Sequence, residues 1–134
     1  MNNPVIQSLR KRRSQYSLGR NLSQSPAEIE ALIKEAIRWS PSSFNSQSSR
    51  AVILFGAQSE RFWELVRESL RPLVPAEAFG ATEQKLASFA AGVGTVLFYE
   101  DQDVVKGLQE QFALYADNFP VWSEHSTGMA QLAT

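Results

Sequence analysis

The stretch PSSFNSQSSR at residues 41–50 carries side chains that could bind a polar ligand. It contains five serines, one asparagine and one glutamine. Hydroxyl and carboxamide groups both donate and accept hydrogen bonds, so such a loop could line a flat heterocycle. Asx and Ser turns in a solvated loop use the same residues. The stretch taken alone favours the ordinary loop, and other residues have to decide between the two.

Two further features carry charge that could act on a ligand. In RKRRS at residues 10–14, guanidinium groups could bind phosphate oxygens and the serine could add a donor. A basic helix end that complements the helix dipole is the simpler interpretation of that run. Lys85 could place a cation beside an electron-accepting ring, whereas the simpler interpretation is a surface lysine paired with a carboxylate.

Other candidates favour structural roles. GVG at residues 92–94 precedes a predicted strand, so a dinucleotide-binding fingerprint is disfavoured. Glu100, Asp101 and Asp103 could form an acid/base group, but helix capping after a strand is the commoner reason for acids at that place. His125 is interpreted as a surface residue or a helix start. The tryptophans and other aromatic residues are interpreted as packing.

The N-terminal half should form helices that position these residues. Asn3 followed by Pro4 predicts a short helix that ends in the basic run. SPAE at residues 25–28 combines an N-cap serine, a proline at the first helical position and a capping-box glutamate. The apolar residues after it recur at helical spacing: Ile29, Leu32, Ile33, Ala36 and Ile37. Ser59 is predicted to cap a third helix, which ends near the prolines at 72 and 75.

The C-terminal half predicts two strands among further helices. AVILF at residues 51–55 and GTVLFYE at residues 94–100 are apolar runs typical of strands buried on both faces. A helix is predicted around residues 82–91, another after Asp101 or Asp103, and a last one in SEHSTGMAQLAT. Small sheets usually need three or more strands. The sequence therefore predicts a mixed α/β layer that is a fragment, a truncated product or completed by another chain.

Composition bounds the class of protein. A chain of 134 residues that is 43% hydrophobic predicts a single domain over residues 1–134. Its formal net charge of −1 argues against nucleic-acid or membrane-surface binding by bulk charge. With no cysteine and one histidine, we expect neither disulfides nor a metal site, and a cytoplasmic protein is the default. The N-terminus is unlike a secretory signal, and no apolar run approaches membrane-spanning length.

Four motifs in the same order resemble the FMN-dependent nitroreductase family. They are RRSQYSLG at 12–19, PSSFNSQSSR at 41–50, ATEQKLASFAAGVGTVLFYED at 81–101 and LYADNFPVWSEHSTGMAQLA at 114–133. The last two are similar to the small bacterial and fungal subgroup related to yeast fatty-acid-response and oxidative-stress members. The resemblance covers almost the whole chain and stops inside the long helix that forms much of the family's dimer core. It implies an α+β sandwich, here incomplete at the C-terminus.

The resemblance also implies cofactor-binding residues. Arg12, Arg13 and Ser14 match the motif that holds the FMN phosphate and ribityl end. The loop residues match the segment that lines the flavin, commonly from the partner subunit: Ser42, Ser43, Asn45 and Gln47. Thr82 and Lys85 match helical positions that reach the pyrimidine edge, where a positive charge favours the reduced flavin. Tyr16 stands where many relatives carry a basic residue, so the pattern is not kept there.

The implied function is an FMN-dependent oxidoreductase. It would take hydride from NADH or NADPH and reduce a nitroaromatic or quinone-like acceptor, with the flavin doing the chemistry and no side chain assigned as catalytic. The implied assembly is a homodimer with FMN at the interface. The alternative is a truncated, inactive nitroreductase-like protein that binds or regulates. Local RNA or DNA binding through the run at residues 10–13 is least favoured, because no base-stacking aromatic platform is evident beside it.

Overall fold

The computed structural model describes residues 3–134, which fall into two compact units. The first unit comprises Met1–Asn21 and Ala57–Val93, and the second comprises Leu22–Gly56 and Gly94–Thr134. Both units thus contain stretches that are far apart in the sequence. The single domain predicted for residues 1–134 would contain both units and stays a prediction.

The first unit opens with the predicted short helix, α1 (Pro4–Lys11). Asn3 caps it, because its side-chain Oδ1 accepts from the backbone N–H groups of Val5 and Ile6 at 3.0 and 3.2 Å. Proline at the first helical position fits there, since that backbone nitrogen needs no helical partner. The helix ends at the basic run, as the sequence predicts.

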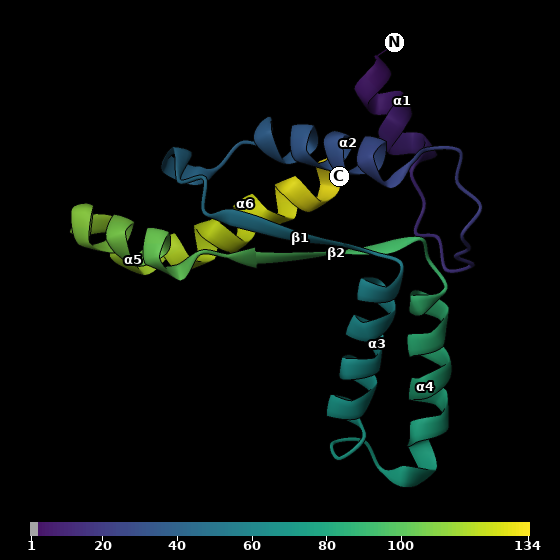
Figure 1. Ribbon diagram of the computed structural model, residues 1–134. Helices are drawn as coiled ribbons and strands as arrows, with labels where there is room; N and C mark the ends of the chain where they lie inside the picture. The colour runs from purple at the N-terminus through teal and green to yellow at the C-terminus, as the bar shows by residue number, and fades with distance from the viewer. Residues whose placement is uncertain (1–2) are drawn as a thin grey trace. The chain divides into compact units, whose positions relative to one another are not determined.

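The first unit also contains a pair of helices, α3 (Ala57–Leu70) and α4 (Ala76–Ala90), which lie side by side (Figure 1). Phe79 and Leu86 of α4 are buried, and the Arg71 guanidinium lies 4.5 Å from the centre of the Phe79 ring. The prediction that Ser59 caps α3 is wrong, because the helix begins at Ala57, directly after Gly56 in a left-handed conformation. Ser59 is instead a buried residue inside the helix.

Helix α4 begins well before the predicted start near residue 82. Pro75 stands at its N-cap position, and the first turns contain Ala76, Ala78 and Gly80. Because these side chains are small, the first turns have little apolar periodicity. The apolar spacing therefore predicts the helix only in its second half.

The second unit contains α2 (Pro26–Arg38), whose capping box forms as predicted. The Ser25 hydroxyl accepts from the Glu28 backbone N–H, and the Glu28 carboxylate accepts from the backbone N–H of Ser25 at 2.7 Å. This backbone donor, followed by the Ser25 hydroxyl, lowers the pKa of Glu28 below its ordinary value.

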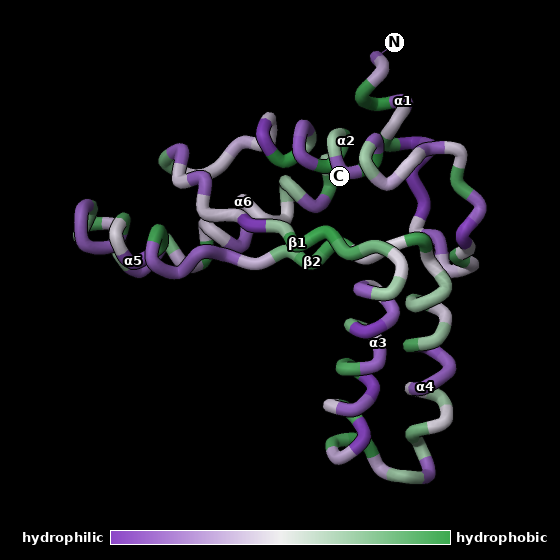
Figure 2. Tube along the Cα trace, viewed as in Figure 1, coloured by the Kyte–Doolittle hydropathy of each residue, from purple (hydrophilic) through white to green (hydrophobic). Residues whose placement is uncertain are grey.

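The two predicted strands pair with each other in an antiparallel ladder. β1 (Ser49–Phe55) and β2 (Gly94–Glu100) run from the pair Ser49 and Glu100 to the pair Phe55 and Gly94. The apolar character of both strands is evident in Figure 2. At Gly94 an added Cβ would lie 2.5 Å from the Leu54 carbonyl oxygen, so only glycine fits this position of the ladder.

The expectation that both strands are buried on both faces is wrong for the chain described. Val52 is 40% exposed and Tyr99 is 53% exposed. The physical reason is that the sheet of residues 3–134 has two strands, with α6 (Phe119–Ala133) packed against both of them. An apolar run shows that a strand can be buried, but it does not show which elements pack against its two faces.

Helix α6 is the centre of the second unit. It contacts the strands β1 and β2 and also the helices α2 and α5 (Gln102–Gln111). Asp101 caps α5 by accepting from the Asp103 backbone N–H at 3.2 Å, which confirms one of the two predicted caps. The short helix η2 (Ala113–Asn118) then leads into α6, which begins at Phe119 rather than in the SEHSTG segment. Pro120 in its first turn suits a helix start.

No helix among residues 3–134 has the length and apolar character needed to cross a membrane.

Candidate functional site

The polar loop at residues 41–50 is closely folded. Its centre is the short helical turn η1 (Ser43–Asn45), and Phe44, Asn45 and Gln47 all have positive φ, at 56°, 51° and 49°. Non-glycine residues rarely adopt this left-handed conformation, because Cβ crowds the following carbonyl oxygen. Three such residues within four positions indicate a loop whose surroundings impose its shape.

Hydrogen bonds within the loop close it on itself. The Ser42 hydroxyl accepts from the Gln47 backbone N–H at 3.0 Å, and the Gln47 side-chain amide donates to Asn45 Oδ1 at 3.2 Å. The Ser42 carbonyl also accepts from the Asn45 backbone N–H at 3.0 Å. The structure therefore brings four predicted binding residues together in one small loop: Ser42, Ser43, Asn45 and Gln47.

Phe44 anchors the loop in a cluster of aromatic rings. Its ring stacks on Trp122 at an interplanar angle of 16°, with centroids 5.7 Å apart. The rings of Phe112 and Phe119 lie 5.1 Å from it, and that of Tyr115 lies 5.8 Å away. The interpretation of these aromatics as packing holds for this cluster. The residue they pack around, however, is the middle of the candidate binding loop.

Helix α6 reaches the same loop through a hydroxyl group. Ser126 Oγ accepts from the Ser43 backbone N–H at 3.1 Å and donates to the Trp122 carbonyl at 2.8 Å. The next residue of the helix, Thr127, donates to Glu100 Oε1 at the end of the sheet, and Ser49 donates to the same oxygen at 2.8 Å. The other Glu100 oxygen, Oε2, is buried without a partner among residues 3–134.

A pocket of about 260 Å³ opens beside this loop. Ser42 and Gln47 line it, together with Arg38 at the end of α2 and Ser126 of α6. The Arg38 guanidinium pairs with Glu35 at 2.7 Å. Because this ion pair occupies the guanidinium, the groups that the pocket offers are the hydroxyls and the amide, which can bind a polar, planar group. No sequence motif marks Arg38 or Ser126 as part of this site.

The predicted phosphate grip lies in the first unit, at the end of α1. Arg12 is the C-cap residue of that helix, and Arg12, Arg13 and Ser14 are all exposed. Arg13 Nη1 donates to the carbonyl oxygens of Arg10 and Arg12 at 2.6 and 2.7 Å. In this conformation Arg13 satisfies the helix end, as the simpler interpretation of the run expects, while Arg12 has no ion-pair partner among residues 3–134.

Thr82 and Lys85 occupy one face of α4, since they are three residues apart on a helix. Thr82 is half-buried and Lys85 is exposed. Lys85 Nζ lies 6.0 Å from the centre of the Phe89 ring, and no carboxylate of residues 3–134 is within ion-pair distance of it. The structure thus disfavours the simpler interpretation of Lys85 as a surface lysine paired with an acid.

The predicted residues therefore form three groups. Arg12 to Ser14 and the pair Thr82 and Lys85 belong to the first unit, and the loop residues belong to the second. Each group lies together within its own unit.

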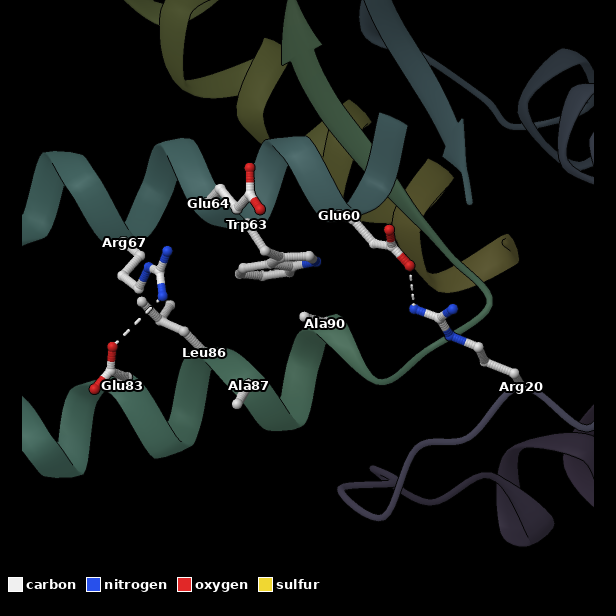
Figure 3. A pocket seen from close by; sticks show the side chains of 9 residues that line it. All are labelled: Arg20, Glu60, Trp63, Glu64, Arg67, Glu83, Leu86, Ala87 and Ala90. Carbon is white, nitrogen blue, oxygen red and sulfur yellow. Dashed lines mark hydrogen bonds and ion pairs between the residues drawn. The ribbon is translucent and has the colours of Figure 1, made fainter. Parts of the chain in front are cut away.

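The first unit also has a groove of about 380 Å³ between α3 and α4 (Figure 3). The Trp63 indole lies over the alanines and leucine of α4, between two ion pairs. Arg20 pairs with Glu60 at 2.6 Å, and Arg67 pairs with Glu83 at 3.6 Å. Glu64, the remaining charged residue of the lining, pairs with Arg61 at 3.3 Å, outside the groove. Because each charged group in the lining is already paired, we interpret the groove as the packing seam of the two helices.

Metal-ligating side chains do not gather in the part of the chain that the structure describes. Within residues 3–134 no group of three or more histidines, cysteines, aspartates or glutamates could hold a metal ion. The acids at the end of β2 instead have structural partners. Asp101 caps α5 and pairs with Arg50 at 2.9 Å, which is the capping role that the sequence favours.

Comparison with known proteins identifies similar chains. The sequence model of the Nitroreductase family matches residues 9–132. The nitroreductase FRM2 of Saccharomyces cerevisiae is 29% identical over 129 residues, and this match covers 95% of the present chain and 64% of FRM2. The present chain thus spans less than two thirds of the length of this curated relative.

Two solved structures have the same fold. The nitroreductase CinD from Lactococcus lactis, in complex with chloramphenicol, superposes with a TM-score of 0.82 at 48% identity, over 96% of this chain and 65% of CinD. The crystal structure of a nitroreductase from Saccharomyces cerevisiae superposes with a TM-score of 0.79 at 27% identity, over 96% of this chain and 70% of that one. These matches confirm the predicted α+β class and the nitroreductase-like arrangement.

Proposed function

The chain belongs to the nitroreductase family, and from this membership we propose that it acts as an FMN-dependent oxidoreductase. The observation that carries the proposal is the family match over residues 9–132, within which the polar loop is folded around left-handed residues. The proposal includes the electron donor, the acceptor and the assembly.

The donor set fits the chemistry of FMN. A phosphate needs cations and hydroxyl donors, which Arg12 and Ser14 supply. A heterocycle with carbonyl and ring-nitrogen groups needs both donors and acceptors, which Asn45 and Gln47 supply through their carboxamides. Ser42, Ser43, Arg13 and Thr82 complete the proposed set, and Lys85 adds a positive charge.

The chemistry that bound FMN supplies is acceptance of hydride from NADH or NADPH and delivery of electrons to an acceptor. The residues of this chain bind and orient. Lys85 would stabilise negative charge at the pyrimidine edge, and its ammonium is available for that role because no acid of residues 3–134 neutralises it. We assign no side chain as a catalytic acid or base.

We propose a nitroaromatic or quinone-like acceptor. Support comes from CinD, whose structures include complexes with chloramphenicol and with 4-nitrophenol. The hydroxyl and amide groups of the loop would orient the ring plane, while the choice of acceptor depends on residues around the bound flavin.

We also propose that the chain forms a homodimer with FMN at the interface. Apolar side chains on α6 support this, since Val121, Met129 and Leu132 are exposed although the helix is the centre of its unit. Exposed apolar residues grouped on one element are typical of a surface that another chain covers.

The test begins with the visible spectrum of the purified protein and the flavin that it releases on denaturation. We expect a yellow protein that releases FMN and oxidises NADH or NADPH in the presence of a nitroaromatic. A colourless protein that does not quench the fluorescence of added FMN would refute the proposed function.

A pair of lysine variants sharpens the test. Replacing Lys85 with glutamine should weaken FMN binding about tenfold, because a charge-assisted contact is lost. Lys106→Gln is the matched control, since Lys106 is an exposed lysine on α5 with no proposed role. Equal FMN affinities for the two variants would remove Lys85 from the site.

A further inference from the structure

The conformation of the polar loop depends on contacts that the loop does not make with itself. Phe44, Asn45 and Gln47 occupy the left-handed region, which a free chain of these residues would rarely populate. Internal bonds of the loop join residues 42, 45 and 47, and the Ser43 carbonyl accepts from the Ser46 backbone N–H at 3.0 Å. The Ser43 backbone N–H instead donates to an acceptor outside the loop. This N–H is therefore the point at which another element can control the loop.

Helix α6 supplies that control through Ser126. Its hydroxyl accepts from the Ser43 backbone N–H at 3.1 Å, and its own proton is committed to the Trp122 carbonyl at 2.8 Å. Ser126 is 1% exposed and lies between the loop and the pocket that it helps to line. Because the O–H bond of Ser126 points to the Trp122 carbonyl, the lone pairs of its oxygen are directed to the backbone of the loop.

The aromatic cluster acts on the next residue of the loop. Phe44 stacks on Trp122, whose carbonyl is the group that orients the Ser126 hydroxyl. The side chain of Phe44 and the backbone of Ser43 are thus held by the same turn of α6. Two contacts to one turn define the position of the loop better than either contact alone.

We propose that Ser126 is a positioning residue, which holds the polar loop in its binding conformation before the cofactor arrives. This inference rests on the proposed function, in which Asn45 and Gln47 of the loop bind FMN. Ser126 acts through the loop, and the affinity for FMN depends on the fraction of molecules whose loop is already in place.

Ser123 provides a matched control on the same helix. It is also buried, and its hydroxyl also donates to a carbonyl of its own helix, that of Pro120, at 2.8 Å. The hydrogen bond from the loop goes to Ser126. Ser123→Ala and Ser126→Ala therefore remove the same group from similar surroundings and differ in the contact to the loop.

The experiment measures FMN affinity by fluorescence quenching and the exchange rate of the Ser43 amide by NMR. We expect Ser126→Ala to weaken FMN binding about tenfold and to speed exchange at Ser43 by a similar factor, while Ser123→Ala changes each by less than about twofold. The melting temperatures of the two variants should be alike. Equal changes in both variants would overturn the positioning role and leave only a packing role.

Two further results keep the inference testable. If Ser126→Ala does not fold, Ser126→Cys fills similar space with a weak acceptor and should show the same changes at reduced size. If the wild-type protein does not bind FMN, the proposed function fails, and Ser43 exchange in the two alanine variants then decides the positioning role by itself. Unchanged exchange in Ser126→Ala or Ser126→Cys would overturn it.

Discussion

Replacing Phe44 by alanine and by glycine should separate the packing of the loop from its backbone strain. Truncating a fully buried phenylalanine costs about 3–5 kcal/mol. Phe44 is 47% exposed, so roughly half of that cost, about 2 kcal/mol, applies to Phe44→Ala. The stacked and tilted ring contacts add about 0.5–1 kcal/mol. Alanine keeps the cost of the left-handed φ of 56°.

Phe44→Gly should be less destabilising than Phe44→Ala, although it removes more atoms. Glycine removes about 1–2 kcal/mol of left-handed backbone strain from the folded state. It also destabilises the fold by about 0.5–1 kcal/mol, because the unfolded chain gains conformational entropy. The glycine variant should therefore be more stable than the alanine variant by about 0.5–1 kcal/mol.

Urea unfolding of the two variants measures this difference directly. Ala31→Gly is the control, because Ala31 is an exposed residue inside α2, where glycine should cost about 1 kcal/mol relative to alanine. The Ala-to-Gly change thus has opposite signs at the two positions. If Phe44→Gly is less stable than Phe44→Ala by as much as the control, the reasoning from backbone conformation is refuted.

Two further substitutions test local contacts. Glu28→Gln should lower the stability of the fold at pH 7, and this effect should disappear in acid. The pKa of Glu28 is lowered in the folded state, so its carboxylate stabilises the fold at pH values above its ordinary pKa of 4.5. This contribution is lost as the pH falls through the folded-state pKa. Thermal melts of both proteins from pH 7 to pH 3 measure the difference, and a constant gap would contradict it. Gly94→Ala should destabilise by about 1–3 kcal/mol, because Cβ would meet the Leu54 carbonyl. Gly107→Ala in α5, where no atom lies within 4 Å of an added Cβ, should instead stabilise by about 0.5–1 kcal/mol in the same denaturant titration.

Local signals made much of the fold predictable. The caps at Asn3 and Ser25 depend on neighbouring residues, and both form as expected. The second strand has the bounds of its apolar run, and the first extends that run by two residues at its start. The start of α4 was missed, because alanine and glycine in its first turns give no apolar rhythm. Burial of the strands could not be read from the sequence, since it depends on what packs against them.

The sequence predicts the types of the binding residues in the candidate site, but it does not predict the contacts that hold those residues in place. The loop is visible in the sequence as a cluster of polar residues. Its left-handed backbone and its anchor in the aromatic cluster arise from long-range packing, which no local pattern reports. One signal was available: Ser123, Ser126, Thr127 and Ala130 recur at helical spacing, and this small polar face is the one that α6 buries. Apolar periodicity overlooks such a face because hydroxyls count as polar.

The pairing of β1 with β2 has a consequence for the length of the connection between them. Phe55 and Gly94 are adjacent in the ladder, while the whole α3 and α4 hairpin lies between them along the sequence. The entropy of closing such a connection grows with the logarithm of its length, so doubling it costs only about 0.6 kcal/mol. Whole helical turns can therefore be inserted or deleted in the hairpin with little effect on strand register. Because distant segments have to meet before the ladder can form, we expect strand pairing to follow the formation of the helices in folding.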